Sequence, residues 1–264
     1  MLLKDKIAVV YGGGGAIGGA TARAFAREGA RVFLAGRTQA RLDTVASDIR
    51  SAGGNAETAV IDVLDEDQVG RHADAVVADA GRIDIAMNAV GFLHVQNVSF
   101  GDLSLADFES PIHEFMRSHF ITAKAAARHM AKQGSGVFLT LSTPGSRPGG
   151  TGYIGYGTTC AAIESFTGHL AAELGGRGIR TICLRPDAMP EAIELSYARK
   201  VFAPAAEAAG MSIDAMLQEH AKSAKLGRLP RLAEVADYAA FVASDRAGAM
   251  TGAIANLTCG SMLD

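Results

Sequence analysis

Short apolar runs recur along this 264-residue chain, and longer amphipathic segments separate them. A short apolar or β-branched run bounded by glycine or polar residues predicts a buried strand. Such runs lie at residues 7–10, 31–35, 58–61, 83–87, 137–141, 179–184 and 253–257. Because helical segments lie between them, the pattern predicts an α/β fold, a seven-stranded parallel sheet with helices on both faces.

The segments between the runs carry helix start and stop signals. Thr38 and Asp65 stand where N-caps are expected, and Gln68 completes a capping box with Asp65. A long helix is expected over 104–132, with a break at Pro111 because proline removes a main-chain donor. The other helices are expected at 16–28, 39–52, 66–80, 156–174 and 232–243.

Residues 186–229 depart from the alternation, since irregular amphipathic pieces rich in Met and Ala replace it. This segment is expected to form a lid over a substrate site. Residues 142–152 are expected to be a glycine- and proline-rich loop. No linker interrupts the pattern, so we expect one domain over residues 1–264.

Four consecutive glycines, Gly12 to Gly15, follow the first predicted strand and precede an alanine-rich helix. Gly13, Gly15 and Gly18 also fit the dinucleotide spacing G-x-G-x-x-G. Strand, glycine turn and helix start together form a phosphate site, because main-chain N–H groups approach the anion closely there. The alternative is a glycine turn that only packs the helix against the sheet.

Charge and cysteine usage narrow the class of protein. The net charge is −3 without any block of like charge, which excludes a nucleic-acid or anionic-membrane footprint. The apolar runs are too short to span a bilayer, and no signal peptide is expected ahead of the first strand. The three cysteines are scattered without metal-ligand spacing, so we expect a cytoplasmic protein without a metal site.

In a parallel α/β sheet the ligand lies across the carboxyl ends of the strands. The turns that follow the strands are therefore the candidate ligand contacts. They lie at residues 12–18, 36–37, 62–63, 88–91, 142–145 and 185–190.

These turns together resemble the short-chain dehydrogenase/reductase family over nearly the whole chain. Gly12 and Gly18 match its glycine motif, with Tyr11 for the usual Thr and Ala16 for the usual middle Gly. The resemblance continues at 62–63, 88–91, 156–186 and 225–252. It implies a Rossmann-type doubly wound sheet and a nicotinamide dinucleotide cofactor. The implied cofactor contacts are Gly12, Gly14, Gly15, Ala16, Ile17, Gly18, Arg37, Asp62, Val63, Asn88, Ala89, Val90, Gly91 and Pro186.

Arg37 distinguishes between the two nicotinamide cofactors. A carboxylate at the end of the second strand would bind the ribose 2′-hydroxyl of NAD, but the chain has Gly36-Arg37 there. A guanidinium suits the 2′-phosphate of NADP. NADP is therefore expected, with NAD possible if Arg37 is only a solvated side chain.

The catalytic positions depart from the family. The resemblance places Tyr156 and Ser142 in the roles of the catalytic Tyr and Ser, although Ser142 is also compatible with a turn residue. Cys160 stands where the family has Lys, and Phe115 falls where it has Asn. Asp187 replaces the glycine that follows Pro186.

The loss of the lysine changes what Tyr156 can do. An unperturbed phenol has a pKa of about 10, so without a neighbouring ammonium it is a poor base near neutral pH but still an acid. Arg147 or Arg185 are candidates for a compensating charge. Cys160 is either a reactive thiol or a packed one.

His94, His113 and His119 lie near the predicted cleft. Each is either a replacement proton donor or a surface or packing histidine.

Two classes of function follow. The first is an NADP(H)-dependent oxidoreductase that reduces a carbonyl or oxidises an alcohol of a hydrophobic or mixed small molecule. The second is a catalytically weak or inactive dinucleotide-binding protein with a sensing or assembly role. In either case the resemblance implies a homotetramer or homodimer, formed through helices 104–132 and 156–174.

Overall fold

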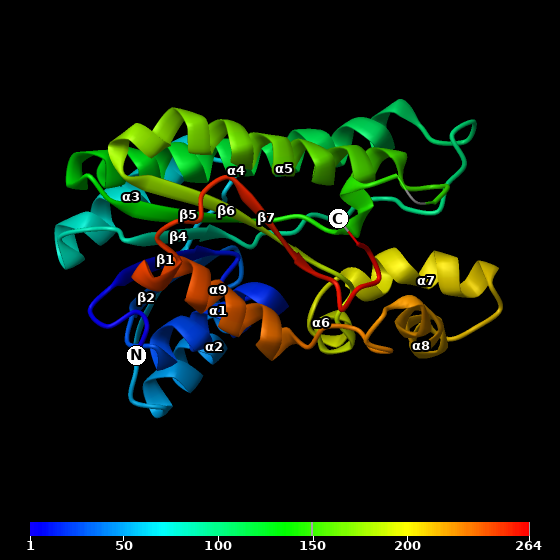
Figure 1. The fold of residues 1–264 in the computed structure, drawn as a ribbon, viewed down its shortest axis with the longest axis horizontal. Coiled ribbons are helices and arrows are strands. Elements are labelled where there is room, and N and C mark those ends of the chain that lie inside the picture. Colours follow the sequence, from blue (N-terminus) through cyan, green and yellow to red (C-terminus); the bar gives the residue numbers. More distant parts are fainter. Residues whose placement is uncertain (149, 264) are drawn as a thin grey trace.

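The predicted alternation folds into one seven-stranded parallel sheet in the computed structural model, which describes residues 1–148 and 150–263 (Figure 1). The described strands are β1 (Ile7–Tyr11), β2 (Arg31–Gly36), β3 (Asn55–Val60), β4 (Ile85–Asn88), β5 (Gly136–Leu141), β6 (Ile179–Pro186) and β7 (Ala253–Leu257). Their order is β3-β2-β1-β4-β5-β6-β7. The order reverses between β1 and β4, so the point where a doubly wound sheet binds its ligand lies beside the glycine turn.

Two helical layers cover the sheet, as predicted. Figure 1 shows α1 (Ala16–Arg27), α2 (Gln39–Ser51) and α9 (Leu232–Ala243) on one face, and α3 (Glu66–Ala80), α4 (Leu105–Gln133) and α5 (Ile154–Leu174) on the other. Successive side chains of a strand point to opposite faces of the sheet, so alternate residues pack into the two cores. In β1, Ala8 and Val10 join the first core, whereas Ile7, Val9 and Tyr11 join the second.

Several predicted boundaries are wrong by a few residues. β3 begins at Asn55 rather than at residue 58, because it lies at the sheet edge, where the polar Glu57 is tolerated and forms an ion pair with Arg31 of β2. β4 begins at Ile85 rather than at residue 83, α5 begins two residues early at Ile154, and β6 extends to Pro186. The predicted loop 142–152 includes residue 149, which lies outside the described residues.

The predicted break at Pro111 is also wrong, since α4 continues through it. α4 packs along α5, and Gly155 of α5 brings its backbone against Phe108 just before the proline. This packing supports both halves of the helix and outweighs the loss of one hydrogen bond.

The predicted caps behave differently. Asp65 accepts the main-chain N–H of Gln68 at 3.0 Å, which confirms the α3 N-cap, but the capping box is wrong, because Gln68 accepts the N–H of Asp62 and not that of Asp65. Thr38 is the N-cap of α2 but forms no side-chain cap hydrogen bond.

Residues 186–229 form three helices rather than sheet: α6 (Pro190–Leu195), α7 (Ala198–Ala208) and α8 (Ile213–Ser223). They have a small apolar core of their own around Ile193, Leu217 and Leu229, and α6 contacts α1. Among the described residues, no helix has both the length and the apolar character needed to cross a bilayer.

Candidate active site

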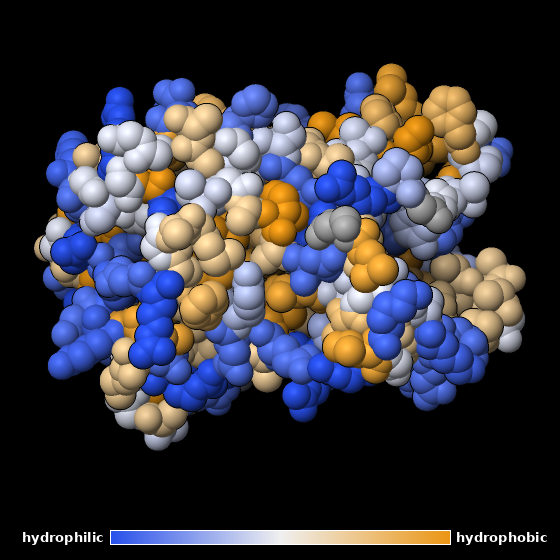
Figure 2. All heavy atoms as spheres, in the orientation of Figure 1, coloured by the Kyte–Doolittle hydropathy of each residue, from blue (hydrophilic) through white to orange (hydrophobic). Residues whose placement is uncertain are grey.

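A cleft of about 1340 Å³ lies across the carboxyl ends of the strands and under the three helices of residues 186–229. The turns after β1, β2, β4, β5 and β6 line it, together with Ile61 and Val63 beyond β3. Figure 2 shows hydrophobic side chains at the surface beside this region, over the loop that precedes α4. The cleft therefore lies where the sequence places the ligand contacts.

The glycine turn is built to bring main chain against a ligand. Gly12 has a φ of +80°, and a Cβ there would lie 2.7 Å from the carbonyl oxygen of Ala89. A Cβ on Gly18 would lie 2.3 Å from the carbonyl oxygen of Gly12. Only glycine fits at either position, so the first turn of α1 presents its N–H groups to the cleft. These features fit a dinucleotide pyrophosphate.

Arg37, Thr38 and Arg41 line the cleft next to the glycine turn. A Cβ on Gly14 would lie 2.9 Å from Cβ of Arg41, so this second arginine packs directly against the turn. In the described part of the chain, the acidic side chain that lines the cleft is Asp187, which follows β6 rather than β2.

Three of the expected cofactor residues, Asp62, Asn88 and Gly18, lie behind the cleft instead of lining it. Asp62 accepts the N–H of Leu64 at 3.0 Å. Asn88 is fully buried and donates to the hydroxyls of Ser118 and Thr122 on α4. Gly18 lies under Gly12, while the other expected cofactor residues line the cleft: Gly12, Gly14, Gly15, Ala16, Ile17, Arg37, Val63, Ala89, Val90, Gly91 and Pro186.

Tyr156 lines the cleft on α5, near Thr143 and Cys160. Burial raises the pKa of the Tyr156 phenol well above its usual value, Cys160 and Tyr197 act in the same direction, and Thr143 opposes them. The Cys160 thiol is fully buried 3.3 Å from the Thr143 hydroxyl, and burial raises its pKa as well. Cys160 is therefore a packed, neutral thiol.

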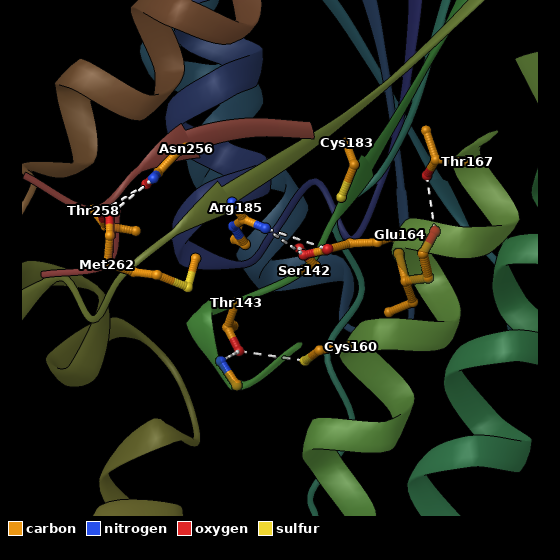
Figure 3. Close-up of polar contacts among 12 residues, drawn as sticks. Ser142, Thr143, Cys160, Glu164, Thr167, Cys183, Arg185, Asn256, Thr258 and Met262 are labelled. Atoms are coloured by element: carbon orange, nitrogen blue, oxygen red, sulfur yellow. Dashed lines mark hydrogen bonds and ion pairs between the residues drawn. The ribbon is translucent and has the colours of Figure 1, made fainter. Parts of the chain in front are cut away.

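Ser142, which the resemblance places in a catalytic role, lines the cleft after β5. Its hydroxyl donates to Glu164 at 2.8 Å, and Glu164 also forms a buried ion pair with Arg185 at 3.3 Å (Figure 3). Thr143, the next residue, provides the hydroxyl beside Cys160 and Tyr156. Of the two adjacent hydroxyls, that of Thr143 therefore lies beside Tyr156, whereas Ser142 lines the cleft with its hydroxyl bonded to Glu164, which Arg185 also contacts.

Of the three candidate histidines, His94 alone lines the cleft among the described residues. Its ring stacks on Tyr156, with 3.8 Å between ring centroids and 8° between planes. Phe115 is buried with its ring edge-on to both. His113 is exposed on α4, and burial lowers the pKa of His119 to about 4, although its hydrogen bond to the carbonyl of Phe115 opposes this.

Asp187 forms a polar junction at the far end of the cleft. It accepts from His220 of α8 at 2.9 Å and from the hydroxyl of Ser261 near the C-terminus. Burial acts to raise the pKa of Asp187, but these hydrogen bonds keep it below the usual value. Asp187 therefore ties α8 and the C-terminal segment to the end of β6.

The sequence analysis missed Thr143, the His94 stack and the partners of Asp187. One signal was present for His94: residues 92–96 alternate, with Phe92, His94 and Gln96 turned inward and Leu93 and Val95 exposed. Polar side chains on the inner side of an extended segment, with apolar ones outside, indicate a site and not a core. In the part of the chain that the structure describes, no group of three or more potential ligands fits a metal ion.

Sequence comparisons identify the family to which this fold and cleft belong. The family model described as "Enoyl-(Acyl carrier protein) reductase" matches residues 14–261. "Short-chain reductase protein NovJ" of Streptomyces niveus is 32% identical over 94% of this chain and 91% of its own length. "7alpha-hydroxysteroid dehydrogenase" of Clostridium sardiniense is 30% identical, over 99% of this chain and 95% of its own.

Solved structures give the same result. An NAD⁺-bound xylitol dehydrogenase superposes with a TM-score of 0.85 at 26% identity, covering 98% of this chain and all of that one. A 7α-hydroxysteroid dehydrogenase complexed with NADH and 7-oxo glycochenodeoxycholic acid shares the fold, with a TM-score of 0.86 at 24% identity over 99% and 96% of the two chains. The glycine turn, the strand order and the position of Tyr156 on α5 agree with these matches. This chain therefore belongs to the short-chain dehydrogenase/reductase family of oxidoreductases, which act on carbonyl and alcohol substrates.

Proposed function

We propose that this protein is an NADP(H)-dependent carbonyl reductase in which Tyr156 is the proton donor. The observation that carries the proposal is the burial of the Tyr156 phenol at the cleft wall, where a neutral thiol replaces the ammonium of the family. With its pKa raised by burial, the phenol stays protonated near neutral pH. It is therefore poised to give a proton and unsuited to accept one.

The residues around the phenol have separate roles in the proposed reaction. The nicotinamide cofactor, when bound along the glycine turn, supplies the hydride. Tyr156 donates its Oη proton to the substrate oxygen, and the Thr143 hydroxyl orients that oxygen. Cys160 and Phe115 carry no charge, so they exclude water from the phenol without lowering its pKa.

The preference for NADP rests on two arginines. Arg37 and Arg41 line the nucleotide end of the cleft, and β2 ends in Gly36 without a carboxylate. A 2′-phosphate gains charge-assisted hydrogen bonds from such guanidinium groups. Titration calorimetry should show NADPH binding at least about 10-fold more tightly than NADH, and Arg37→Ala should remove most of that difference. Equal affinities in the wild type would reject the assignment.

The substrate proposed is a mainly apolar carbonyl compound. Apolar side chains of the lid and of the loop before α4 line the outer cleft, among them Phe100, Ile193, Val201, Phe202 and Met216. Of the polar groups in the lining, His94, Gln96 and Asp187 hydrogen-bond within the protein, whereas the Ser146 hydroxyl has no partner among the described residues. An apolar molecule with a few polar groups therefore fits this lining best.

The decisive experiment follows the NADPH absorbance band with purified protein and a panel of ketones, from short hydroxyketones to cyclic apolar ones. Turnover is expected with the apolar ketones, and Tyr156→Phe should reduce kcat at least about 100-fold while leaving NADPH affinity unchanged. Thr143→Val should reduce kcat more than Ser142→Ala does. NADPH binding without any turnover would instead support a dinucleotide-binding protein without chemistry.

We further propose two-fold association through α4 and α5. Their outer faces expose Phe120 together with small residues such as Ala161, Ser165 and Gly168, which permit close approach of a second copy. Light scattering at micromolar concentration should give a dimer or tetramer mass. A monomer mass would reject the association.

A further inference from the structure

The segment between β4 and α4 turns its polar residues inward. His94 and Gln96 face the cleft beside the buried Phe92, whereas Leu93 is 58% exposed and Val95 is 38% exposed. Enclosing an imidazole and an amide costs free energy unless both groups are hydrogen-bonded. His94 and Gln96 meet this condition by bonding to each other, which leaves the half-buried imidazole at the cleft wall beside Tyr156.

Two hydrogen bonds fix the His94 ring in one orientation and one tautomer. Nδ1 lies 2.8 Å from the carbonyl oxygen of Phe92, which can only accept, so Nδ1 carries the proton. Nε2 then accepts from the amide of Gln96, also at 2.8 Å. Since both ring nitrogens are engaged, the imidazole cannot rotate without losing a bond.

The fixed ring lies flat on the side chain of Tyr156. The centroids are 3.8 Å apart and the planes differ by 8°, so the contact covers the face of the phenol ring. Phe115 closes the edge, 5.9 Å from the Tyr156 centroid and 6.1 Å from that of His94. Burial lowers the pKa of His94, although its bond to Phe92 opposes this, so the ring is neutral near pH 7 and acts by contact and not by charge.

We propose that His94 is a positioning residue, which holds the Tyr156 phenol in its proton-donating orientation by stacking against it. The inference rests on the proposed role of Tyr156 and deepens it. Cys160 provides no ammonium and Phe115 provides no amide beside the phenol. The stacked imidazole of His94 is therefore the group that restricts the Tyr156 ring. A displacement of a reacting group by about 1 Å can reduce a rate by about 100-fold, so such a restraint matters for catalysis.

The test compares two substitutions at position 94. His94→Phe keeps a ring over Tyr156 and loses both hydrogen bonds, whereas His94→Leu keeps most of the volume and loses the ring. We expect His94→Leu to lower kcat for NADPH-dependent ketone reduction at least about 10-fold, with the KM for NADPH within about twofold. His94→Phe should recover to within about threefold of the wild type. His113→Ala, an exposed histidine on α4, is the matched control and should change neither constant.

A second measurement needs neither cofactor nor turnover. The near-ultraviolet circular dichroism of Tyr156, obtained as the difference from a Tyr156→Phe background, reports how firmly this ring is held. The difference signal should collapse in His94→Leu and persist in His94→Phe. The near-ultraviolet signal of the other aromatic residues should persist in both variants and shows that they are folded.

The outcomes separate the two proposals. Wild-type kcat or an unchanged Tyr156 signal in His94→Leu would overturn the positioning role. So would a His94→Phe variant as impaired as His94→Leu, because the imidazole itself would then be required. If the wild type shows no turnover at all, the proposed reductase function fails, while the spectroscopic comparison still decides whether His94 holds Tyr156.

Discussion

The two ends of the cleft are built by different means. At the nucleotide end, one continuous stretch from Gly12 to Gly18 presents main chain, and its shape depends on missing side chains. At the catalytic end, side chains from the β4–α4 segment, α4, the end of β5 and α5 converge around Tyr156. The comparison teaches that a backbone-built site tolerates almost no change, whereas a side-chain-built site can exchange its members and keep the fold.

The catalytic end is enclosed by uncharged side chains. Cys160 is a buried thiol, and His94, Phe115 and Thr143 surround the phenol of Tyr156. At the nucleotide end, Gly12 and Gly18 are the positions where a Cβ would collide with main chain, and each of them is glycine in this chain.

The largest effect is expected from a side chain in the glycine turn. Gly18→Val would place its Cβ about 2.3 Å from the carbonyl oxygen of Gly12, which is a steric clash that forces the turn open. NADPH affinity measured by calorimetry should fall by more than about 100-fold. The matched control is Gly70→Ala on α3, where a Cβ meets nothing within 4 Å and binding should be unchanged. Near-normal binding by Gly18→Val would show that the turn does not contact the cofactor.

The next effect concerns the charges behind the catalytic end. Glu164→Gln removes the carboxylate that accepts from Ser142 and pairs with the fully buried Arg185. Because breaking a buried ion pair is strongly destabilising, the free energy of unfolding should fall by about 3 kcal/mol in urea titrations. Glu219→Gln, which breaks the exposed pair with Lys222, should cost less than about 0.5 kcal/mol. Equal losses would mean that the buried pair has no special role.

A smaller effect tests how the uncharged Cys160 sets the proton affinity of Tyr156. Cys160→Lys should lower the Tyr156 pKa, because a positive charge favours the phenolate. Phenolate then exists at lower pH, so the pH profile of alcohol oxidation should move down by about 1–2 units. The inserted chain should also destabilise the fold by about 1–3 kcal/mol. Cys160→Ser adds no charge and should leave the profile unmoved; an unmoved profile in a folded Cys160→Lys variant would contradict the assignment of Tyr156.

The smallest effect is expected at the lid. The hydrogen bond to Asp187 raises the pKa of His220, although burial opposes it, so protonated His220 stabilises the folded state. This contribution is complete below the ordinary histidine pKa of about 6.5 and is lost as pH rises through the folded value. The melting-temperature difference between wild type and His220→Gln should therefore be larger near about pH 6 than near about pH 8. Since the His220 side chain is 44% exposed, the contribution should stay below about 1 kcal/mol. The exposed His169→Gln should show no such trend, and an equal difference at both pH values would exclude the coupling.

Much of the fold was predictable because its signals are local. The apolar runs, the Asp65 cap and the glycine turn each act within a few residues, and the structure confirms all three. Pro111 was mispredicted for the opposite reason, because contacts with α5, nearly fifty positions later in the chain, support the helix on both sides of it.

The sequence by itself determined the parallel sheet, the site of the glycine turn and the presence of Tyr156 in a cleft beyond the strands. Only the tertiary structure decided which of two adjacent hydroxyls faces the phenol. Ser142 and Thr143 reach residues one turn apart on α5, Glu164 and Cys160 respectively. It also brought His94 onto Tyr156 across 62 positions of chain, through a segment without regular structure. Periodicity and propensity act over short distances, whereas the chemistry of a site built from side chains depends on which distant segments meet.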